Sequence, residues 1–223
     1  MLLQNRVGRK IVMSVTGLAM VVFVIIHLLG NASLFNGPDG INAYAKLLHS
    51  LGAFLWLIRL TMLAALCLHI FFGILLTLEN RAAKPQRYAV RRDLSTTLAG
   101  RNMIWTGLLI AIYLVYHLLH FTLEVIYPGL AAYRNPDAAG RPDIFMMVVL
   151  SFRNISVAGL YVLAMGALTL HLSHGIQSMF QTLGLNNEKT LPAVMKIGTI
   201  AAVVLFLGYI AIPVSIFAGL VGK

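Results

Sequence analysis

Five apolar stretches, each long enough to cross a lipid bilayer, constrain this chain more than any other feature. A transmembrane helix needs about 20 predominantly apolar residues, and the five stretches cover about 11–29, 54–78, 103–126, 155–180 and 193–220. Only 11% of the 223 residues are charged, whereas soluble domains carry about 25%. The sequence therefore predicts an all-α integral membrane bundle of five transmembrane helices, forming a single domain over 1–223.

The basic residues are distributed unequally between the two sides of this predicted bundle. Arg6, Arg9 and Lys10 precede the first span, and the stretch between the second and third spans is the most basic of the chain. Its basic residues are Arg81, Lys84, Arg87, Arg91, Arg92 and Arg101. Because loops rich in Lys and Arg stay in the cytoplasm, we expect a cytoplasmic N-terminus and an external C-terminus. The same asymmetry explains most of the net charge of +10, so nucleic acid is not an expected partner.

Histidine is the polar residue that recurs inside the spans. Those within spans are His27, His69, His117, His120, His171 and His174. An ionisable group inside a bilayer is costly and usually functional. One histidine on an apolar helix is more often a hydrogen-bonded packing residue, but here each of the first four spans carries at least one. The single cysteine, Cys67, excludes an internal disulfide and a Cys-x-x-Cys-His haem attachment, and we expect it to be a buried apolar residue.

A weak internal repeat distinguishes some of these histidines from others. The first span reads TGLAMVVFVIIH over 16–27, and the third reads TGLLIAIYLVYH over 106–117. The second span contains HIFFG over 69–73, and the fourth contains HLSHG over 171–175. Spans one and two are therefore echoed by spans three and four. The echo favours His117 and His171, and disfavours the neighbouring histidines three residues further along.

Helix geometry pairs the four selected histidines by depth. Spans one and three run in one direction and spans two and four in the other, and a helix rises 1.5 Å per residue. This places His27 at the depth of His117, and His69 at the depth of His171. Two imidazoles facing each other from two helices are what a bis-histidine haem needs, because the iron takes one nitrogen from each side of the macrocycle. The sequence therefore predicts two b-type haems.

Four glycines accompany these histidines: Gly17, Gly73, Gly107 and Gly175. A glycine beside a ligand allows the flat macrocycle to approach the helix backbone, and Gly17 and Gly107 lie ten residues before their histidines, at the level of the other haem. The alternative is that these small residues only allow helices to pack closely, as they often do in membranes.

In their order and spacing these motifs resemble the di-haem cytochrome b membrane anchor of succinate:quinone oxidoreductases, in its single-subunit, five-helix form. The resemblance rests on VTGLAMVVFVIIHLLGN, RNMIWTGLLIAIYLVYHLLHF and HLSHGIQSMFQTLG, and it covers the whole chain. It implies that His27 and His117 hold the haem distal from the cytoplasmic subunits, and that His69 and His171 hold the proximal haem. Thr169 stands where some family members carry a glutamate linked to transmembrane proton movement, so that route gains no support here.

The resemblance also implies an activity and partners. The anchor would lie in the bacterial inner membrane and pass electrons between a cytoplasmic iron–sulfur subunit and a quinone, usually menaquinone in this family of succinate dehydrogenases and fumarate reductases. A flavoprotein subunit would interconvert succinate and fumarate. We do not expect this chain to do so alone, because it has no dinucleotide fingerprint and no cysteine cluster.

Two other functions fit parts of the pattern. One is the cytochrome b anchor of a hydrogenase or formate dehydrogenase, which would differ in its partner subunits. The other is a transporter that uses histidines as proton relays. A transporter is expected to carry an acidic residue or a broken helix at the midplane, and the central parts of the spans contain no Asp or Glu.

Two further residues are candidates for contact with haem propionates. Arg59 lies ten residues before His69, and it either reaches a propionate by charge-assisted hydrogen bonds or snorkels to the membrane interface. His174 lies one turn beyond His171, and it either touches a propionate or forms a hydrogen bond between helices.

The remaining polar residues suggest a quinone site. His120 and Glu124 follow His117 at spacings of three and seven residues, so on a continuous helix they share its face approximately. Their side chains would then line a pocket beside the distal haem, where quinone reduction requires protons. Lys46 and His49, in the stretch between the first two spans, are candidate lid residues.

Overall fold

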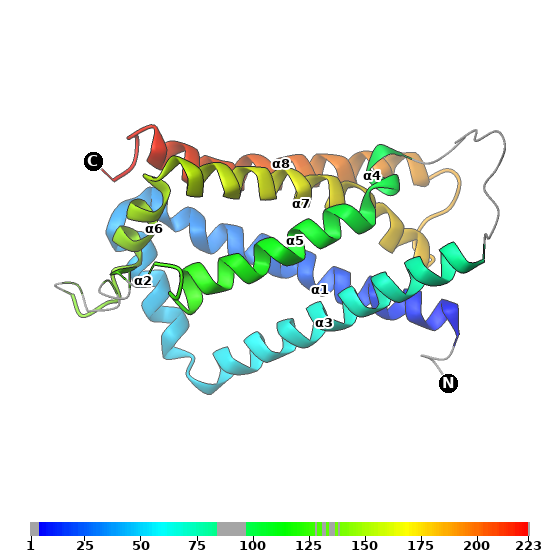
Figure 1. The fold of residues 1–223 in the computed structure, drawn as a ribbon, viewed down its shortest axis with the longest axis horizontal. Coiled ribbons are helices and arrows are strands. Elements are labelled where there is room, and N and C mark those ends of the chain that lie inside the picture. The colour runs from blue at the N-terminus through cyan, green and yellow to red at the C-terminus, as the bar shows by residue number, and fades with distance from the viewer. Residues whose placement is uncertain are drawn as a thin grey trace.

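The computed structural model describes residues 5–83, 97–127, 129–130, 133, 137 and 139–222. It contains five helices long and apolar enough to cross a membrane, which confirms the predicted helical multi-pass architecture (Figure 1). They are α1 (Arg6–Ala32), α3 (Ala53–Ala82), α5 (Met103–His117) with the π-helical turn η3 (Leu118–Thr122), α7 (Ile155–Thr182) and α8 (Leu191–Phe217). Four basic residues used above for the orientation, Lys84, Arg87, Arg91 and Arg92, lie outside the described residues.

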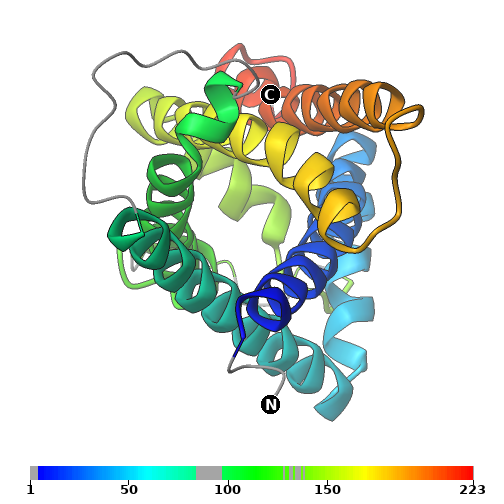
Figure 2. The same cartoon turned by 90° about the vertical axis from the view of Figure 1, so that its right-hand side faces the viewer.

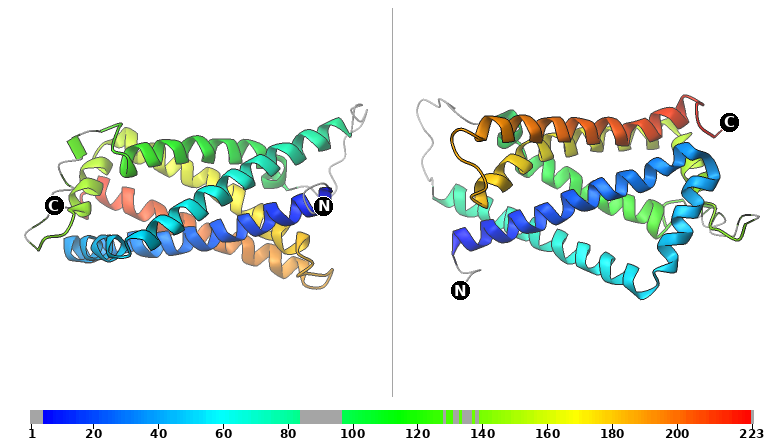
Figure 3. Two further views of the ribbon diagram at one scale, coloured as in Figure 1. Left: turned by 90° about the horizontal axis from the view of Figure 1, so that it is seen from below. Right: turned by 180° about the vertical axis from the view of Figure 1, so that it is seen from behind.

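The five long helices form one bundle whose two chain termini lie at opposite ends (Figure 1). We call the end where α1 begins the N-terminal end, and the other the C-terminal end. Seen along the bundle axis, the long helices form a ring (Figure 2). α3 packs along α1, and α7 packs along both α5 and α8 (Figure 3). Helix α8 also approaches α1 closely, since a Cβ atom added at Gly208 would lie 2.6 Å from Leu28 Cδ2.

Short helices close the C-terminal end, and the sequence pattern did not predict them. They are η2 (Ser33–Asn36), α2 (Gly37–Ser50) and α6 (Ile144–Phe152). The chain turns from α1 into α2 at Gly37, whose φ of 75° favours glycine. α6 is strongly apolar but has only nine residues, which is too short to span a bilayer. Its side chains instead form the largest buried cluster, together with residues of η2, α2, α7 and α8.

A network of hydrogen bonds and ion pairs holds α2 against the segment that leads into α6. Asn42 is only 1% exposed. Its Oδ1 accepts a hydrogen bond from the Phe145 backbone N–H at 2.9 Å, and its Nδ2 lies 3.3 Å from Asp143 and 3.4 Å from Asp137. Arg141 extends this network, binding Asp137 at 2.9 Å and Asp39 of α2 at 2.6 Å. Every polar atom of the buried amide is thereby satisfied.

The third span ends earlier than the sequence pattern predicted. Apolar residues continue to 126, but the helix ends at Thr122 with a π-helical turn, four residues before the expected end of the span. The backbone N–H of Val125 bonds to the Leu119 carbonyl at 2.9 Å, which closes the helix end. Glu124 follows with φ of 55°, and among the described residues no other non-glycine has a positive φ. A helix that appeared continuous from its hydropathy therefore ends in a strained turn.

Cys67 also departs from the expectation, because it lies on the exposed face of α3 and not in the interior. An apolar side chain in a membrane protein has no reason to avoid the outer surface, since lipid tails are as apolar as the protein core. Hydropathy therefore distinguishes spanning segments from loops, but not the inward from the outward face of a span.

Candidate functional site

Four histidines from four different helices meet in two pairs. The ring centroids of His27 on α1 and His117 on α5 are 6.0 Å apart, and those of His69 on α3 and His171 on α7 are 6.3 Å apart. We call these the α1/α5 pair and the α3/α7 pair. The structure thus brings together the same partners that depth along the helices had suggested.

The spacing within each pair fits two imidazoles on opposite sides of one metal ion. A metal–imidazole nitrogen bond is about 2 Å long and that nitrogen lies about 1.1 Å from the ring centroid, so two opposed ligands have centroids about 6.2 Å apart. The observed values of 6.0 and 6.3 Å lie on either side of this figure. The distance between the two rings of each pair is therefore compatible with one iron held between them.

The two pairs lie at different levels of the bundle. His69 Nδ1 contacts the backbone oxygen of Met13 on α1 at 3.0 Å, and a Cβ at Gly17 would lie 3.2 Å from His69 Cε1. His27 is ten residues beyond Gly17 on the same helix, or about 15 Å at 1.5 Å per residue. The α3/α7 pair is therefore nearer the N-terminal end, and the α1/α5 pair nearer the C-terminal end.

Hydrogen bonds fix the tautomer of both histidines in the α3/α7 pair. A backbone carbonyl only accepts, so His69 Nδ1 carries the proton that it donates to Met13. The Thr106 hydroxyl donates within its own helix to the Asn102 carbonyl at 3.0 Å, and its oxygen lies 3.2 Å from His171 Nδ1. That oxygen is then free to accept from Nδ1–H. Both rings keep the Nε2 lone pair available, as metal-binding histidines do.

The Thr-Gly echo in the sequence has a structural counterpart. Thr16 Oγ1 lies 3.4 Å from His69 Nδ1, much as Thr106 contacts His171. A Cβ atom at Gly107 would lie 3.2 Å from His171 Cε1, the same distance as between Gly17 and His69. These two glycines make room for an imidazole of the facing helix, which is a role that neither sequence interpretation included.

The other two glycines of the motif differ from these. Apart from the backbone of its own helix, a Cβ atom added at Gly73 or Gly175 would meet no atom of the described residues within 4 Å. They therefore do not serve close packing of helices in the chain alone, and the space beside them suits the interpretation that a flat macrocycle approaches the backbone there.

Aromatic side chains surround the α1/α5 pair. Phe23 stacks on His27 with centroids 5.4 Å apart, and Tyr209 lies 6.4 Å from it. Around His117 the centroids of Tyr113, Phe121 and Tyr161 lie at 5.8, 5.8 and 5.9 Å. The Tyr161 hydroxyl also lies 3.3 Å from His117 Nδ1. This environment is apolar with one polar contact to the ring.

His120 lies beside this pair but does not line an open pocket by itself. It is fully buried. Its Nδ1 is 3.0 Å from the Tyr161 hydroxyl, and its Nε2 is 3.2 Å from Ser151 Oγ on α6. Glu124 is also buried, with 7% of its surface exposed. Both predicted quinone-site residues are thus inside the protein at the irregular end of the third span, although the continuous helix assumed for them is absent.

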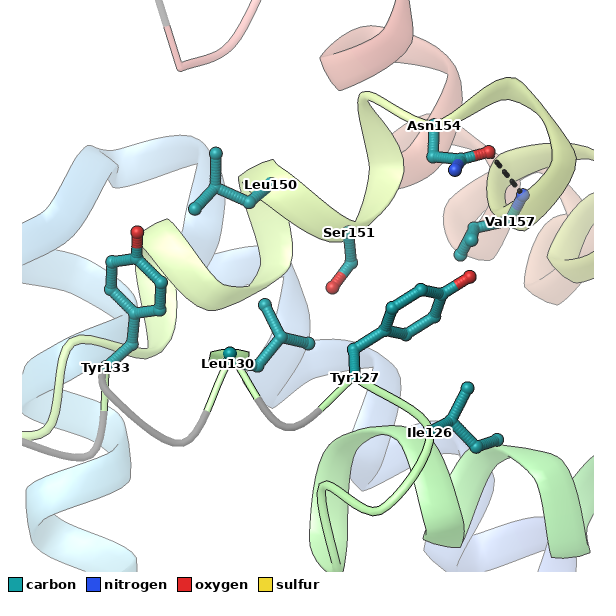
Figure 4. A pocket seen from close by; sticks show the side chains of 9 residues that line it. Ile126, Tyr127, Leu130, Tyr133, Leu150, Ser151, Asn154 and Val157 are labelled. Atoms are coloured by element: carbon teal, nitrogen blue, oxygen red, sulfur yellow. Dashed lines mark hydrogen bonds between the residues drawn. The ribbon is translucent and has the colours of Figure 1, made fainter.

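A cavity of about 410 Å³ adjoins this region at the C-terminal end. Its polar lining comes from Tyr127, Tyr133, Ser151 and Asn154, and apolar side chains complete it (Figure 4). Ser151 points toward Leu130 and Tyr127 in this view (Figure 4). Since Ser151 also contacts His120, the cavity and the α1/α5 pair are connected through hydrogen bonds.

Of the other predicted site residues, three are exposed, and His174 lies one turn beyond His171 on α7. Arg59 is exposed on α3 with its guanidinium 5.1 Å from the centre of the Trp56 ring, which suits the interface-anchor alternative. Lys46 and His49 are exposed on α2. His174 faces the short helix α4 (Leu98–Arg101), where a Cβ at Gly100 would lie 3.0 Å from its Cε1. Within the described residues its Nδ1 is buried without a hydrogen-bond partner.

Sequence reasoning missed several residues that position the histidines. Thr16 and Thr106 were visible as half of a repeated Thr-Gly doublet, and the repeat could have identified them. Tyr161 and Ser151 carried no comparable signal, because each is a single polar residue in an apolar stretch. Comparison with protein-family models, curated proteins and solved structures found no match to this chain. The geometry of the four histidines is therefore the main indication of function.

Proposed function

We propose that this protein is a di-haem cytochrome b membrane anchor, which carries electrons across part of the bilayer between a partner subunit and a quinone. The observation that carries the proposal is the meeting of four histidines in two pairs with centroids 6.0 and 6.3 Å apart. Hydrogen-bonded or enclosed imidazoles at two levels of a helical bundle are the ligand set that two bis-histidine haems require.

The four histidines and the groups around them have defined roles in this proposal. Haem, when bound, supplies a one-electron carrier. His69 and His171 are oriented by acceptors on α1 and α5, and His27 and His117 by an aromatic enclosure. Aromatic and aliphatic side chains exclude water around the α1/α5 pair, and this low-polarity surrounding influences a haem potential.

We further propose that the N-terminal end faces the cytoplasm and docks an iron–sulfur subunit. A flavoprotein subunit would supply that subunit with electrons from succinate, or accept electrons from it to reduce fumarate. The basic stretch between α3 and α5 supports this orientation. Electrons would then pass the α3/α7 pair before the α1/α5 pair in the direction of quinone reduction, since the former is nearer that end.

Quinone chemistry belongs in this proposal at the C-terminal end. His120 is buried within the π-helical turn beside the α1/α5 pair, and Glu124 is buried two residues after the end of that turn. Such turns and residues with strained backbone are frequent at functional sites. The cavity of about 410 Å³ lies within reach of the same network through Ser151, and menaquinone is the quinone that the family resemblance implies.

The direct test is the haem content of the purified protein. A pyridine haemochrome assay should find two non-covalent haems per chain, and electron paramagnetic resonance (EPR) should show two six-coordinate low-spin ferric signals. Absence of haem, or one haem per chain, would refute the proposal. Identification of co-purifying subunits separates the succinate:quinone complex from a hydrogenase or formate dehydrogenase, because these complexes differ in the subunits bound to the anchor.

A further inference from the structure

The Tyr161 hydroxyl lies between two histidines and belongs to a hydrogen-bond network that runs from α6 to α5. Its oxygen is 3.0 Å from His120 Nδ1 and 3.3 Å from His117 Nδ1. His120 Nε2 contacts Ser151 Oγ at 3.2 Å, and Ser151 in turn donates to the Met147 carbonyl at 2.8 Å. Five groups are thus connected in a fixed order.

The direction of every hydrogen bond in this network follows from its last member. The Met147 carbonyl can only accept, so it takes the single hydroxyl proton of Ser151. Ser151 Oγ is then the acceptor for His120 Nε2–H, which leaves His120 Nδ1 as a lone pair. That lone pair accepts the hydroxyl proton of Tyr161, since a neutral imidazole carries one donor and one acceptor nitrogen.

The network therefore determines the state of His117. Because the Tyr161 proton is directed to His120, the Tyr161 oxygen faces His117 as an acceptor, and His117 Nδ1 must carry a proton to donate. The Nε2 atom of His117 is then left with its lone pair. This is the tautomer in which a histidine binds a metal through Nε2.

The two pairs reach this tautomer by different means. In the α3/α7 pair the acceptors for Nδ1–H are close to the backbone, at Met13 and Thr106. In the α1/α5 pair the acceptor for His117 Nδ1–H is the hydroxyl of Tyr161, a side chain on α7, and that side chain is enclosed. Tyr161 is 6% exposed, and its ring meets Phe152 and Tyr113 edge-on with centroids 4.9 and 5.2 Å apart.

We propose that Tyr161 is a positioning residue for the α1/α5 pair, which holds His117 in its metal-binding tautomer and links that histidine to the cavity-lining Ser151 through His120. The inference rests on the proposed haem function. It adds that the two haems are controlled by different hydrogen-bond partners, so a change at Tyr161 affects one haem and spares the other.

The test compares Tyr161→Phe with Tyr113→Phe in the full chain purified with its partner subunits. Both tyrosines contact the His117 ring at nearly equal centroid distances, 5.9 and 5.8 Å, and each variant loses one hydroxyl. Of these two tyrosines, Tyr161 is the one whose hydroxyl is hydrogen-bonded to His117. The readouts are the midpoint potentials of both haems, their low-spin EPR g values, and the rate of haem loss to apomyoglobin.

We expect Tyr161→Phe to raise the midpoint potential at the α1/α5 pair, because an imidazole whose N–H loses its acceptor is a weaker donor and stabilises ferric iron less. Haem affinity at this pair should fall about 10- to 100-fold, the usual effect of removing such a partner. The potential and g values at the α3/α7 pair should not change. Tyr113→Phe should resemble the unmodified protein in all three readouts.

A second variant covers the case in which Tyr161→Phe does not fold. Ser151→Ala removes the acceptor of His120 Nε2–H, so His120 can take either neutral tautomer and the Tyr161 proton is no longer directed to it. The midpoint potential at the α1/α5 pair should then shift in this variant too, but less than in Tyr161→Phe. Equal behaviour of Tyr161→Phe and Tyr113→Phe would overturn the proposal, and if the former does not fold, an unchanged potential in Ser151→Ala would do so. Absence of haem in the unmodified protein would instead refute the proposed function.

Discussion

Gly107→Ala should disturb the α3/α7 pair although it adds only one methyl group. The added Cβ would lie 3.2 Å from His171 Cε1 and 3.7 Å from His171 Nδ1. Carbon atoms in contact prefer about 3.5–4.0 Å, so the ring must withdraw by about 0.5 Å. Metal–ligand distances are held within about 0.2 Å, and the displacement therefore exceeds what an iron–nitrogen bond tolerates.

The expected result is weaker haem binding at one pair only. We expect affinity at the α3/α7 pair to fall about 10- to 100-fold, comparable with the loss of a partner that orients a ligand. Its low-spin EPR signal should diminish while the signal of the α1/α5 pair remains. Haem content and the rate of haem transfer to apomyoglobin measure the change, and Gly17→Ala should act in the same way on His69, which it approaches at the same 3.2 Å.

Gly166→Ala on α7 is the matched control. A Cβ atom there would meet no described atom outside its own helix backbone within 4 Å, and alanine is favoured over glycine in a helix interior by about 1 kcal/mol. This variant should therefore keep both haems and be no less stable than the unmodified protein. If Gly107→Ala lost haem no faster than Gly166→Ala and kept both low-spin signals, the assignment of His171 as a ligand would be wrong.

Three further predictions address the other groups. His171→Ala should lose one haem, whereas His174→Ala should keep both; loss in His174→Ala with retention in His171→Ala, measured by haemochrome assay, would reverse the assignment. His120→Ala and Glu124→Gln should each reduce quinone-linked activity at least about tenfold, which corresponds to a rise of about 1.4 kcal/mol in the activation free energy. Succinate oxidation with a soluble dye should persist in both variants. Normal quinone activity in both would exclude this placement of the quinone site. Hydrogen bonds from the Arg141 backbone and side chain lower the pKa of Asp137. The network that holds α2 to the segment before α6 should therefore be fully stable above about pH 4, the pKa of an aspartate in the unfolded chain. It should weaken as the pH falls through the lower pKa that Asp137 has in the folded protein. Hydrogen exchange at 139–147 measures this, and Asp137→Asn should remove the dependence.

The five spans, apart from the end of the third helix, and the pairing of the four histidines were accessible from the sequence. Hydropathy over about 20 residues is a strong signal for a membrane-spanning helix, and each of the five predicted spans has a counterpart among the long helices. The rise of 1.5 Å per residue is nearly invariant, so spacing along the chain gives depth, and depth brought His27 to His117 and His69 to His171. That these pairs bind haem remains a prediction.

Only the tertiary structure decided how these histidines are oriented and what lies between them. Thr16 and His69 are 53 residues apart in the sequence, and His120 and Tyr161 are 41 apart. Such contacts depend on how helices rotate and cross, and hydropathy contains no information on rotation when both the lipid and the protein interior are apolar. The same ambiguity hid the outward direction of Cys67, and the π-helical turn before Glu124 was hidden because apolar residues continue past it. Depth is a property of one helix and can be read from its residues, whereas facing is a property of two helices and appears only when they pack.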